Sequence, residues 1–370
     1  MKYLFINSVC GVGSTGRIVA EKCRELMAQG HECRVAFGRK EANSQDLSVI
    51  RIGTSKDYCL HAVQSRIFDN HGFGSQRATM QLLEQIRAYD PDVIWLHNLH
   101  GYYIHIGLLF GYLKTCGKEI RWTLHDCWAF TGHCAYFDYV NCQRWRSGCY
   151  DCPQKKTYPA SFLMDRSSCN YEQKRELFTG IPNLTLITPS VWMRDLVKES
   201  FLKEYPVEVC CNTVDTDIFH PVQSNFRGQH NLEQKKILLG VASVWEPRKG
   251  LEDFVKLSGE LDGRYQVVLV GVTEAQAKKL PRNILTILRT NSPTELAQIY
   301  SAADVFVNPT YEDNYPTVNL EAQACGIPVV CYDTGGSSET LKAGSVLVPK
   351  GDLQAMKEAI CRMTDGGENR

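Results

Sequence analysis

The chain has no excess of charge of either sign, since 41 Lys and Arg residues stand against 41 Asp and Glu residues among 370. Proteins that bind nucleic acid usually carry a clear basic excess, so this balance argues against that class. The sequence also lacks any apolar run of about 18 residues, the length that a membrane-spanning helix needs. The opening residues MKYLFINSVCGVGSTGR hold only a short apolar run and no cleavage pattern of a secretory signal. We therefore expect a cytoplasmic protein, and its attachment to the inner face of the plasma membrane stays open.

Cysteine, by contrast, is abundant, with 16 copies. Without an export signal these residues are expected to be thiols or metal ligands and not disulfides. Hydrophobic residues make up 44% of the chain and charged residues 22%, which is typical of a soluble globular protein with a sizeable core.

Short apolar runs alternate with helical patterns along the chain. The first run, residues 3–9, leads into a glycine-rich turn at residues 11–16 and then into a helical pattern at residues 17–27. Further strands are predicted at residues 33–37, 92–96, 120–124, 184–187 and 207–210. Apolar strands that alternate with helices favour a mostly parallel sheet covered on both faces.

The same pattern starts again near residue 236. Strands are predicted at residues 236–241, 266–270, 284–288, 304–308, 328–331 and 345–348, and helices at residues 251–261, 293–302, 317–325 and 353–363. The polar stretch 223–234 is interpreted as a linker. The predicted fold class is therefore α/β, with two doubly wound, Rossmann-like domains at residues 1–213 and 214–370 that face each other across a cleft.

Residues 11–16 match the pattern G-x-G-x-x-G between a strand and a helix. Gly13, Ser14 and Gly16 would let backbone N–H groups approach a phosphate at a helix N-terminus. A dinucleotide site also needs an acidic residue after the second strand, which here leads into Gly-Arg-Lys instead. Since Arg39 could bind a 2′-phosphate, an NADP-dependent oxidoreductase is an alternative function, and a tight turn that only packs the helix is the structural alternative.

A second cluster, at residues 308–321, reads NPTYEDNYPTVNLE. A helix is expected to begin within it, and free N–H groups at a helix N-terminus attract a diphosphate. Asp313 in the loop and Glu321 about one turn into the helix could line the same ligand, although acids near a helix start often serve only as caps. The donor-binding residues predicted for this loop and helix start are Asn314, Tyr315, Pro316 and Thr317.

Residues 308–330 resemble the C-terminal signature of the family 4 retaining glycosyltransferases of the GT-B fold, in which a Glu-x7-Glu pair precedes an A-x-A-C/S-G-x-P-V-V run. Glu321 and the sequence AQACGIPVV that follows it match this signature closely. The first acid falls on Asp313, where the family usually carries Glu. The resemblance implies two catalytic roles, in which Glu321 holds the donor ribose and Asp313 orients the donor sugar.

Two further segments extend the resemblance toward the start of the second domain. The sequence NTVD at residues 212–215 is similar to the interdomain segment of the family. Arg248 and Lys249 precede a glycine as in the turn that opens the family's second domain, and the resemblance implies that Lys249 contacts the donor diphosphate. The family's partner Arg would fall on Val244, so Arg248 is expected to supply that charge.

In the first domain, TLHD at residues 123–126 resembles the T-x-H-D segment of the family. The resemblance implies that His125 is a catalytic residue that stabilises the donor sugar from across the cleft, and that the glycine-rich loop at residues 11–16 borders donor and acceptor. On position alone, a structural histidine at a strand end is the alternative for His125. The Cys-rich residues 127–155 are similar to an insertion in the colanic-acid and capsule-type branch, which implies a role in surface polysaccharide assembly.

Two patterns raise the question of a metal. The D-T-D of residues 215–217 has a spacing that can hold a divalent cation, but its place in the interdomain segment favours hinge structure. Cys149 and Cys152 have the spacing of half a zinc site, and Cys134 and Cys142 supply two more thiols. Since the insertion shows little apolar periodicity, a structural zinc would explain its order, and reduced, unligated thiols are the alternative.

Together, these similarities imply an enzyme that moves a sugar with retention from a nucleotide-diphosphate-sugar donor to a saccharide or lipid-linked saccharide acceptor. The resemblance implies that the released phosphate oxygen takes the acceptor proton and that catalysis requires no cofactor. Peripheral membrane association is compatible with such an acceptor. Two alternatives stay open, the NADP-dependent oxidoreductase and a non-catalytic nucleotide-sugar sensor of the same fold.

Overall fold

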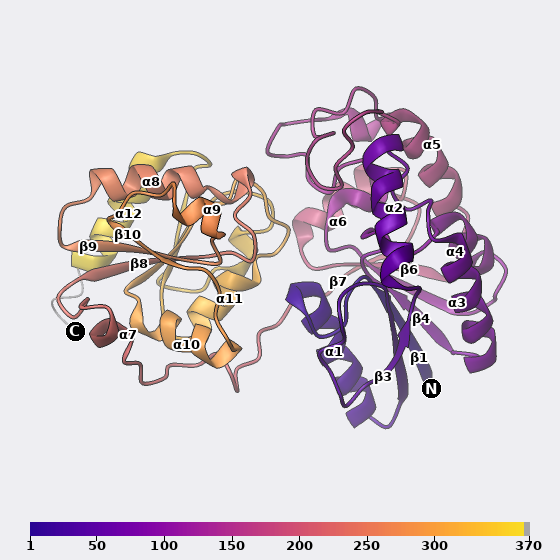
Figure 1. Ribbon diagram of the computed structural model, residues 1–370, viewed down its shortest axis with the longest axis horizontal. Coiled ribbons are helices and arrows are strands. Elements are labelled where there is room, and N and C mark those ends of the chain that lie inside the picture. The colour runs from indigo at the N-terminus through magenta and orange to yellow at the C-terminus, as the bar shows by residue number, and fades with distance from the viewer. Residues whose placement is uncertain (366–370) are drawn as a thin grey trace. The chain divides into compact units, whose positions relative to one another are not determined.

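The computed structural model of the protein describes residues 1–365, and its contacts divide the chain into two compact units, Met1–Cys211 and a second unit that begins at Asn212. Each unit is built on its own parallel sheet with helices on both faces (Figure 1). The predicted α/β class with two doubly wound sheets is confirmed.

The first unit holds a seven-stranded sheet in the order β3-β2-β1-β4-β5-β6-β7, with every neighbouring pair parallel. Its strands are β1 (Lys2–Asn7), β2 (Glu32–Phe37), β3 (Ser48–Arg51), β4 (Val93–Leu96), β5 (Glu119–Thr123), β6 (Leu184–Thr188) and β7 (Val207–Val209). Its α-helices are α1 (Gly13–Ala28), α2 (Ser55–Phe68), α3 (Gln76–Tyr89), α4 (Ile106–Leu113), α5 (Ser167–Phe178) and α6 (Val191–Glu199).

The central strands of this sheet are apolar on both faces because both faces are covered. Side chains of α1, among them Val19 and Cys23, pack with Phe5 and Trp95 against one face. Residues from α3 and α4, such as Leu82 and Phe110, pack with Ile94 and Leu96 against the other. This two-sided burial explains why the strands read as unbroken apolar runs in the sequence.

The second unit holds a six-stranded parallel sheet in the order β10-β9-β8-β11-β12-β13. Its strands are β8 (Lys236–Val241), β9 (Tyr265–Val270), β10 (Ile284–Ile287), β11 (Val305–Asn308), β12 (Val329–Tyr332) and β13 (Val346–Val348). Its α-helices are α7 (Phe226–Gln229), α8 (Leu251–Glu260), α9 (Glu274–Ala277), α10 (Pro293–Ala302), α11 (Thr317–Ala324) and α12 (Leu353–Asp365).

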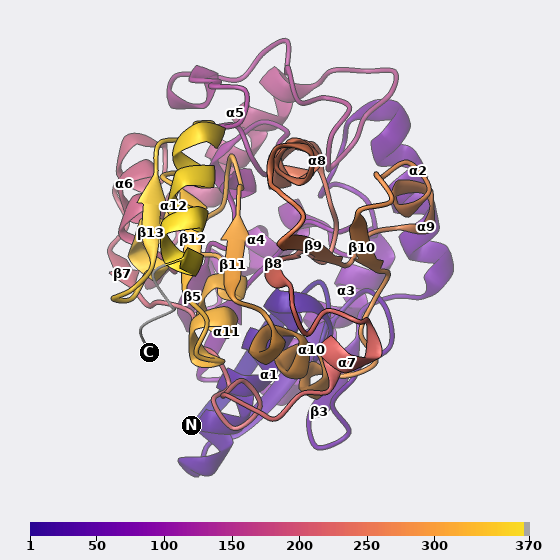
Figure 2. The same ribbon diagram turned by 90° about the vertical axis from the view of Figure 1, so that its left-hand side faces the viewer.

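Two separate apolar cores flank this second sheet. Helices α8 and α12 cover one face, where Phe254 and Ile360 are fully buried (Figures 1 and 2). Helices α10 and α11 cover the other face, where Tyr300 and Ala322 are fully buried. Among the described helices, none is long and apolar enough to cross a membrane.

The structure corrects three details of the sequence interpretation. Helix α1 begins at Gly13 and not at Arg17, so most of the glycine-rich turn is helical. Strand β3 was not predicted, since only Ile50 of its four residues is buried. Residues 223–234 are not a linker, because they include α7 and bury Phe226 and Leu232 in the core of the second unit.

Candidate active site

In the second unit, two loops follow the neighbouring strands β8 and β11. The chain continues from these strands toward opposite edges of the sheet, so they flank the point where the strand order reverses. Open α/β sheets bind ligands beyond the carboxyl ends of the strands at such a point. The loop after β8 carries Arg248 and Lys249, and the loop after β11 carries Asp313 and Asn314.

The structure brings Lys249 and Asp313 into direct contact. Lys249 Nζ donates a hydrogen bond to Asp313 Oδ2, and the two side chains are only 19% and 16% exposed. Burial favours a raised pKa for Asp313, but the positive charges of Lys249 and Arg248 outweigh it, and the pKa lies below its usual value. Burial and the neighbouring Arg248 lower the pKa of Lys249, against the opposing pull of Asp313. The pair is therefore a mostly buried, charge-compensated site.

Arg248 connects the two loops. Its Nη1 donates to the backbone oxygen of Glu312 at 2.8 Å, and its Nε lies 3.0 Å from Glu246 Oε2. The backbone N–H of Tyr311 donates to the oxygen of Arg248 at 2.7 Å. Val244, where the family's partner Arg was expected, is 57% exposed and contributes no charge.

A glycine pair after β12 fixes the position of Asp313. The N–H of Gly336 donates to the backbone oxygen of Asp313 at 3.2 Å. Gly335 has a φ of +56°, and a Cβ at this position would lie 1.8 Å from the same oxygen. Only glycine fits there, a requirement that the sequence interpretation missed although the Gly-Gly pair is visible in the sequence.

Helix α11 begins directly after this loop. Its N-cap residue, Pro316, supplies no side-chain hydrogen bond to the first turn, which begins at Thr317. The loop residue Asn314 is 4% exposed, and Tyr315 is half-buried. Glu321 lies one turn into the helix, is 4% exposed, and accepts a hydrogen bond at Oε2 from the hydroxyl of Tyr300, 3.1 Å away. The cluster predicted from the sequence therefore spans the loop and the first turns of α11, and Asn314 and Glu321 within it are almost fully buried.

In the first unit, the glycine-rich loop joins β1 to α1. The N–H of Gly11 donates to the oxygen of Gly16 at 3.0 Å, and Gly16 is buried against Val9. Gly13 and Ser14 are exposed at the start of the 16-residue helix, and Val12 gives no side-chain cap. The loop is thus both a tight turn and an open helix N-terminus.

His125 follows β5 and is half-buried. Its Nε2 lies 2.9 Å from Nδ1 of His97, a residue that follows the neighbouring strand β4 and is 2% exposed. Burial lowers the pKa of His125 to about 4, and burial together with His125 holds the pKa of His97 well below its usual value. The sequence interpretation missed His97, and its place after a strand adjacent to β5 was the only signal available.

The acid next to His125 has other partners. Asp126 Oδ2 lies 2.7 Å from Nε2 of His100, and Asp126 Oδ1 accepts from the N–H of Trp128 at 3.0 Å. Nδ1 of His100 lies 2.9 Å from the hydroxyl of Tyr158. Asp126 therefore organises the start of the insertion that follows it.

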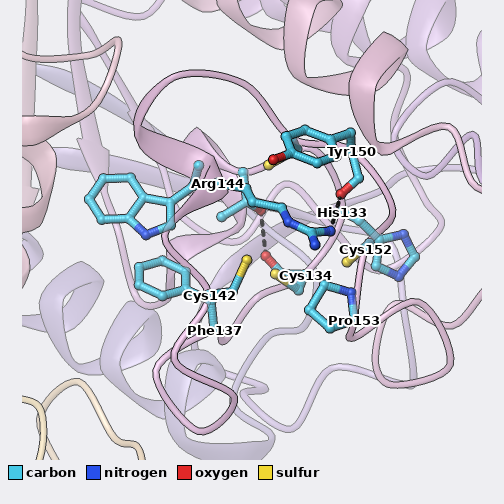
Figure 3. A pocket seen from close by; sticks show the side chains of 11 residues that line it. His133, Cys134, Phe137, Cys142, Arg144, Tyr150, Cys152 and Pro153 are labelled. Carbon is cyan, nitrogen blue, oxygen red and sulfur yellow. Dashed lines mark hydrogen bonds between the residues drawn. The ribbon is translucent and has the colours of Figure 1, made fainter.

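The four cysteines singled out from the sequence gather around one small cavity, together with His133 (Figure 3). The cavity of about 10 Å³ is lined by Cys134, Cys142, Cys149 and Cys152, and by aromatic and basic side chains. The N–H of Gly132 donates to Sγ of Cys149 at 3.2 Å. Within residues 1–365, however, no group of three or more His, Cys, Asp or Glu side chains is placed to hold a metal ion.

The insertion also contains an apolar core, which the sequence interpretation did not anticipate. Phe137 stacks on Trp145, with ring centroids 4.9 Å apart, and both are buried beside Phe130. The buried Lys174 of α5 donates to the backbone oxygens of Trp128 at 2.8 Å and Thr131 at 3.0 Å. Aromatic packing and this lysine therefore contribute to the order of the segment.

The remaining acidic pattern, at residues 215–217, serves local structure. Asp215 Oδ1 accepts from the N–H of Asp217 at 3.0 Å, and the backbone oxygen of Asp215 accepts from Phe219 at 2.8 Å. The first of these contacts is typical of an Asx turn, and the second closes a backbone turn.

Comparison with known proteins favours the glycosyltransferase over the oxidoreductase. Residues 222–370 match the family described as Glycosyl transferases group 1, and this segment carries the loops of Lys249 and Asp313 and helix α11. Residues 222–370 form a domain of the group 1 glycosyltransferases. A putative colanic acid biosynthesis glycosyl transferase, WcaC of Escherichia coli strain K12, is 22% identical to this glycosyltransferase. The alignment covers 95% of the present chain and 88% of WcaC.

Solved structures agree on the fold of this glycosyltransferase. Sucrose-phosphate synthase from Thermosynechococcus elongatus superimposes with a TM-score of 0.71 at 18% identity, over 98% of this chain and 90% of that one. Anabaena HepE in complex with UDP-glucose superimposes with a TM-score of 0.68 at 13% identity, over 99% of this chain and 90% of the HepE chain. The GT-B fold and the enzyme class of a retaining glycosyltransferase are confirmed, and the oxidoreductase alternative is set aside.

Proposed function

We propose that this enzyme transfers a sugar, with retention of anomeric configuration, from a nucleotide-diphosphate-sugar to a saccharide or lipid-linked saccharide acceptor in surface polysaccharide assembly. The similarity to a colanic acid glycosyl transferase supports the pathway. The similarity to a structure that holds UDP-glucose supports the donor class. The observation that carries the proposal is the mostly buried Lys249–Asp313 pair beside the start of α11.

In this proposal, Lys249 and Arg248 neutralise the donor diphosphate. Backbone groups of residues 314–317 at the start of α11 add hydrogen bonds and a favourable helix dipole. Glu321 binds the ribose hydroxyls, with Tyr300 fixing its carboxylate. Asp313, held beside Lys249, orients the donor sugar.

The residues of the first unit would act on the sugar. His125 donates a hydrogen bond to it, and Gly13, Ser14 and Gly16 border donor and acceptor. The bond from the anomeric carbon to the phosphate oxygen breaks, the bond to the acceptor oxygen forms on the same face, and the acceptor proton moves to the leaving phosphate oxygen. Cationic groups around the diphosphate stabilise the charge that develops there.

The test is transfer by Glu321→Ala, with Glu358→Ala on the exposed face of α12 as its matched control. We expect Glu321→Ala to raise the KM for the donor and to lose most transfer while the fold remains, since the ribose then lacks its carboxylate partner. Near-normal turnover by Glu321→Ala would reject the proposed donor site. A folded wild-type protein that turns over no nucleotide-sugar in a donor panel would favour the non-catalytic sensor.

A further inference from the structure

His97 and His125 form a hydrogen-bonded pair of imidazoles at the carboxyl ends of adjacent strands. The planes of the two rings make an angle of 19° with centroids 5.2 Å apart, and their contact joins Nδ1 of His97 to Nε2 of His125. The ring of His97 stacks on the ring of Trp95. The Nε1 of Trp122 donates a hydrogen bond to the backbone oxygen of His97 at 3.1 Å. The position of the His97 ring is therefore fixed by the core of the sheet.

The direction of the proton between the rings can be inferred. Burial keeps both imidazoles neutral near pH 7, so each ring has one N–H and one lone pair. Within the described residues, Nε2 of His97 is buried and has no hydrogen-bond partner. A buried N–H without an acceptor is rarer and costlier than a lone pair without a donor. This arrangement favours the tautomer in which His97 carries its proton on Nδ1 and donates it to Nε2 of His125.

The partner of a histidine nitrogen sets the tautomer of its ring. We propose that His97 is a positioning residue that holds His125 in the Nδ1–H tautomer, so that His125 meets the donor sugar as a hydrogen-bond donor and not as a base. This inference rests on the proposed function for its consequence in catalysis. It agrees with a reaction in which the leaving phosphate takes the acceptor proton, because such a reaction needs no base at His125.

The neighbouring acid does not provide this alignment. Asp126 directs its two carboxylate oxygens to His100 and to the backbone N–H of Trp128, at 2.7 and 3.0 Å. Although His125 and Asp126 are adjacent in the sequence, the contact that orients the His125 ring comes from β4. The pair His97–His125 thus takes the place that a histidine–carboxylate pair holds in enzymes with a general base.

The direct test measures the tautomer in the full chain without substrate. The ring nitrogens are observed by ¹⁵N NMR of protein labelled at histidine, with His125→Gln used to assign the signals of His125. We expect Nδ1 of His125 to be protonated and Nε2 to be unprotonated at pH 7. An Nε2–H tautomer or an imidazolium would overturn the inference, and neither result depends on whether the enzyme turns over its donor.

Two variants at residue 97 add a kinetic test. His97→Leu removes the donor, and His97→Asn places an amide N–H near the former Nδ1. We expect His97→Leu to lower kcat by about tenfold, the worth of one hydrogen bond, with the donor KM little changed. We expect His97→Asn to recover most of the loss and the Nδ1–H signature.

The outcomes separate the possible roles of His97. If His97→Leu keeps both the tautomer and turnover, His97 is not a positioning residue. If His97→Asn is as impaired as His97→Leu while both stay folded, the role of His97 is packing alone. Should His97→Leu fail to fold, the spectrum of the wild-type chain still decides the tautomer. Full activity of His125→Gln would instead reject the proposed role of His125.

Discussion

The two units prepare their strand-end sites in opposite ways. In the first unit the imidazoles of His97 and His125 are neutral, since burial lowers the pKa of His125 to about 4 and that of His97 well below its usual value. In the second unit the groups are charged, because Lys249 and Arg248 lower the pKa of Asp313 and balance its charge. The same sheet architecture thus supports a hydrogen-bonding site in one unit and an ionic site in the other.

The difference matches the two ends of the proposed donor. Neutral imidazoles suit sugar hydroxyls, which need directional hydrogen bonds and no charge compensation. A diphosphate carries negative charge that grows as the leaving group departs, so it needs cations in a mostly buried site. We therefore expect the positive charge of Lys249 in the second unit to contribute more to the rate of sugar transfer than the imidazole of His125 in the first unit.

The largest expected effect is therefore on transfer by Lys249→Ala. Removing a preorganised cation from a developing oxyanion typically costs about 100- to 1000-fold in kcat. We expect His125→Ala to cost only about tenfold, as the loss of one neutral hydrogen bond. The measurement is steady-state transfer, with Lys256→Ala on the exposed face of α8 as the control. Equal losses in the two variants would break the comparison between the units.

The sequence predicted the charged site of the second unit but only one of the two histidines in the first. Lys249, Asp313 and Glu321 lie in motifs whose spacing and family resemblance place them beside a diphosphate, and the structure brings Lys249 and Asp313 together. Tyr300 and His97 were missed because their roles depend on neighbours far away in the chain, Glu321 and His125. A local sequence pattern predicts where a strand ends or a helix starts. It does not predict which side chain of a spatially neighbouring element contacts the residue at that position.

A buried cation in the first unit offers the second test. Burial lowers the pKa of Lys174 to about 7, although its ammonium donates to two backbone oxygens and lies 3.5 Å from the Trp128 ring centroid. The pKa in the unfolded chain is about 10.4. Between these values the unfolded state binds more protons, so the contribution of Lys174 to stability rises with pH, by up to about 1.4 kcal/mol per pH unit.

The Lys174→Met variant should therefore be more destabilised at pH 9 than at pH 7. Urea unfolding followed by fluorescence at both pH values measures the difference, with the exposed Lys198→Met as control. A destabilisation that stays constant between the two pH values would show that Lys174 does not titrate in this window.

Acid should weaken the first unit before the second. Nε2 of His61 accepts the N–H groups of Gly72 and Gly74, at 3.3 and 3.1 Å, and burial lowers the pKa of this 1% exposed residue to about 4. In the unfolded chain the pKa is about 6.5, so the unfolded state binds more protons between pH 6.5 and 4. Stability is lost as the pH falls through this window, by up to about 3 kcal/mol in all.

Hydrogen exchange at pH 7 and pH 5 can localise this loss. We expect amides near His61 to lose protection at pH 5 after correction for the intrinsic exchange rate, and His61→Gln to remove much of the pH dependence. His220→Gln, an exposed histidine of the second unit, is the matched control. Equal acid sensitivity of the two units would contradict the assignment of neutral histidines to the first.

The smallest expected effect concerns the Cys-rich insertion, where the sequence left zinc and reduced thiols as equal alternatives. The buried rings of Phe130, Phe137 and Trp145 already give this segment a core. If that core orders the segment, Cys142→Ser changes a partly buried thiol and should cost no more than about 0.5 kcal/mol. Cys116→Ser, a partly buried thiol outside the insertion, should cost about the same.

Metal analysis of the same proteins completes the test, because a structural zinc contributes directly to folding and its ligands are not interchangeable with serine. Aromatic order predicts substoichiometric zinc in both the wild type and Cys142→Ser, and a melting temperature that a chelator leaves unchanged. One zinc per wild-type chain that is lost in Cys142→Ser, but kept in Cys116→Ser, would require the thiols to close around a metal. The first unit would then contain a site that depends on a bound cation, as the donor site of the second unit depends on Lys249 and Arg248. The contrast between a neutral first unit and an ionic second unit would then hold for the strand-end sites alone.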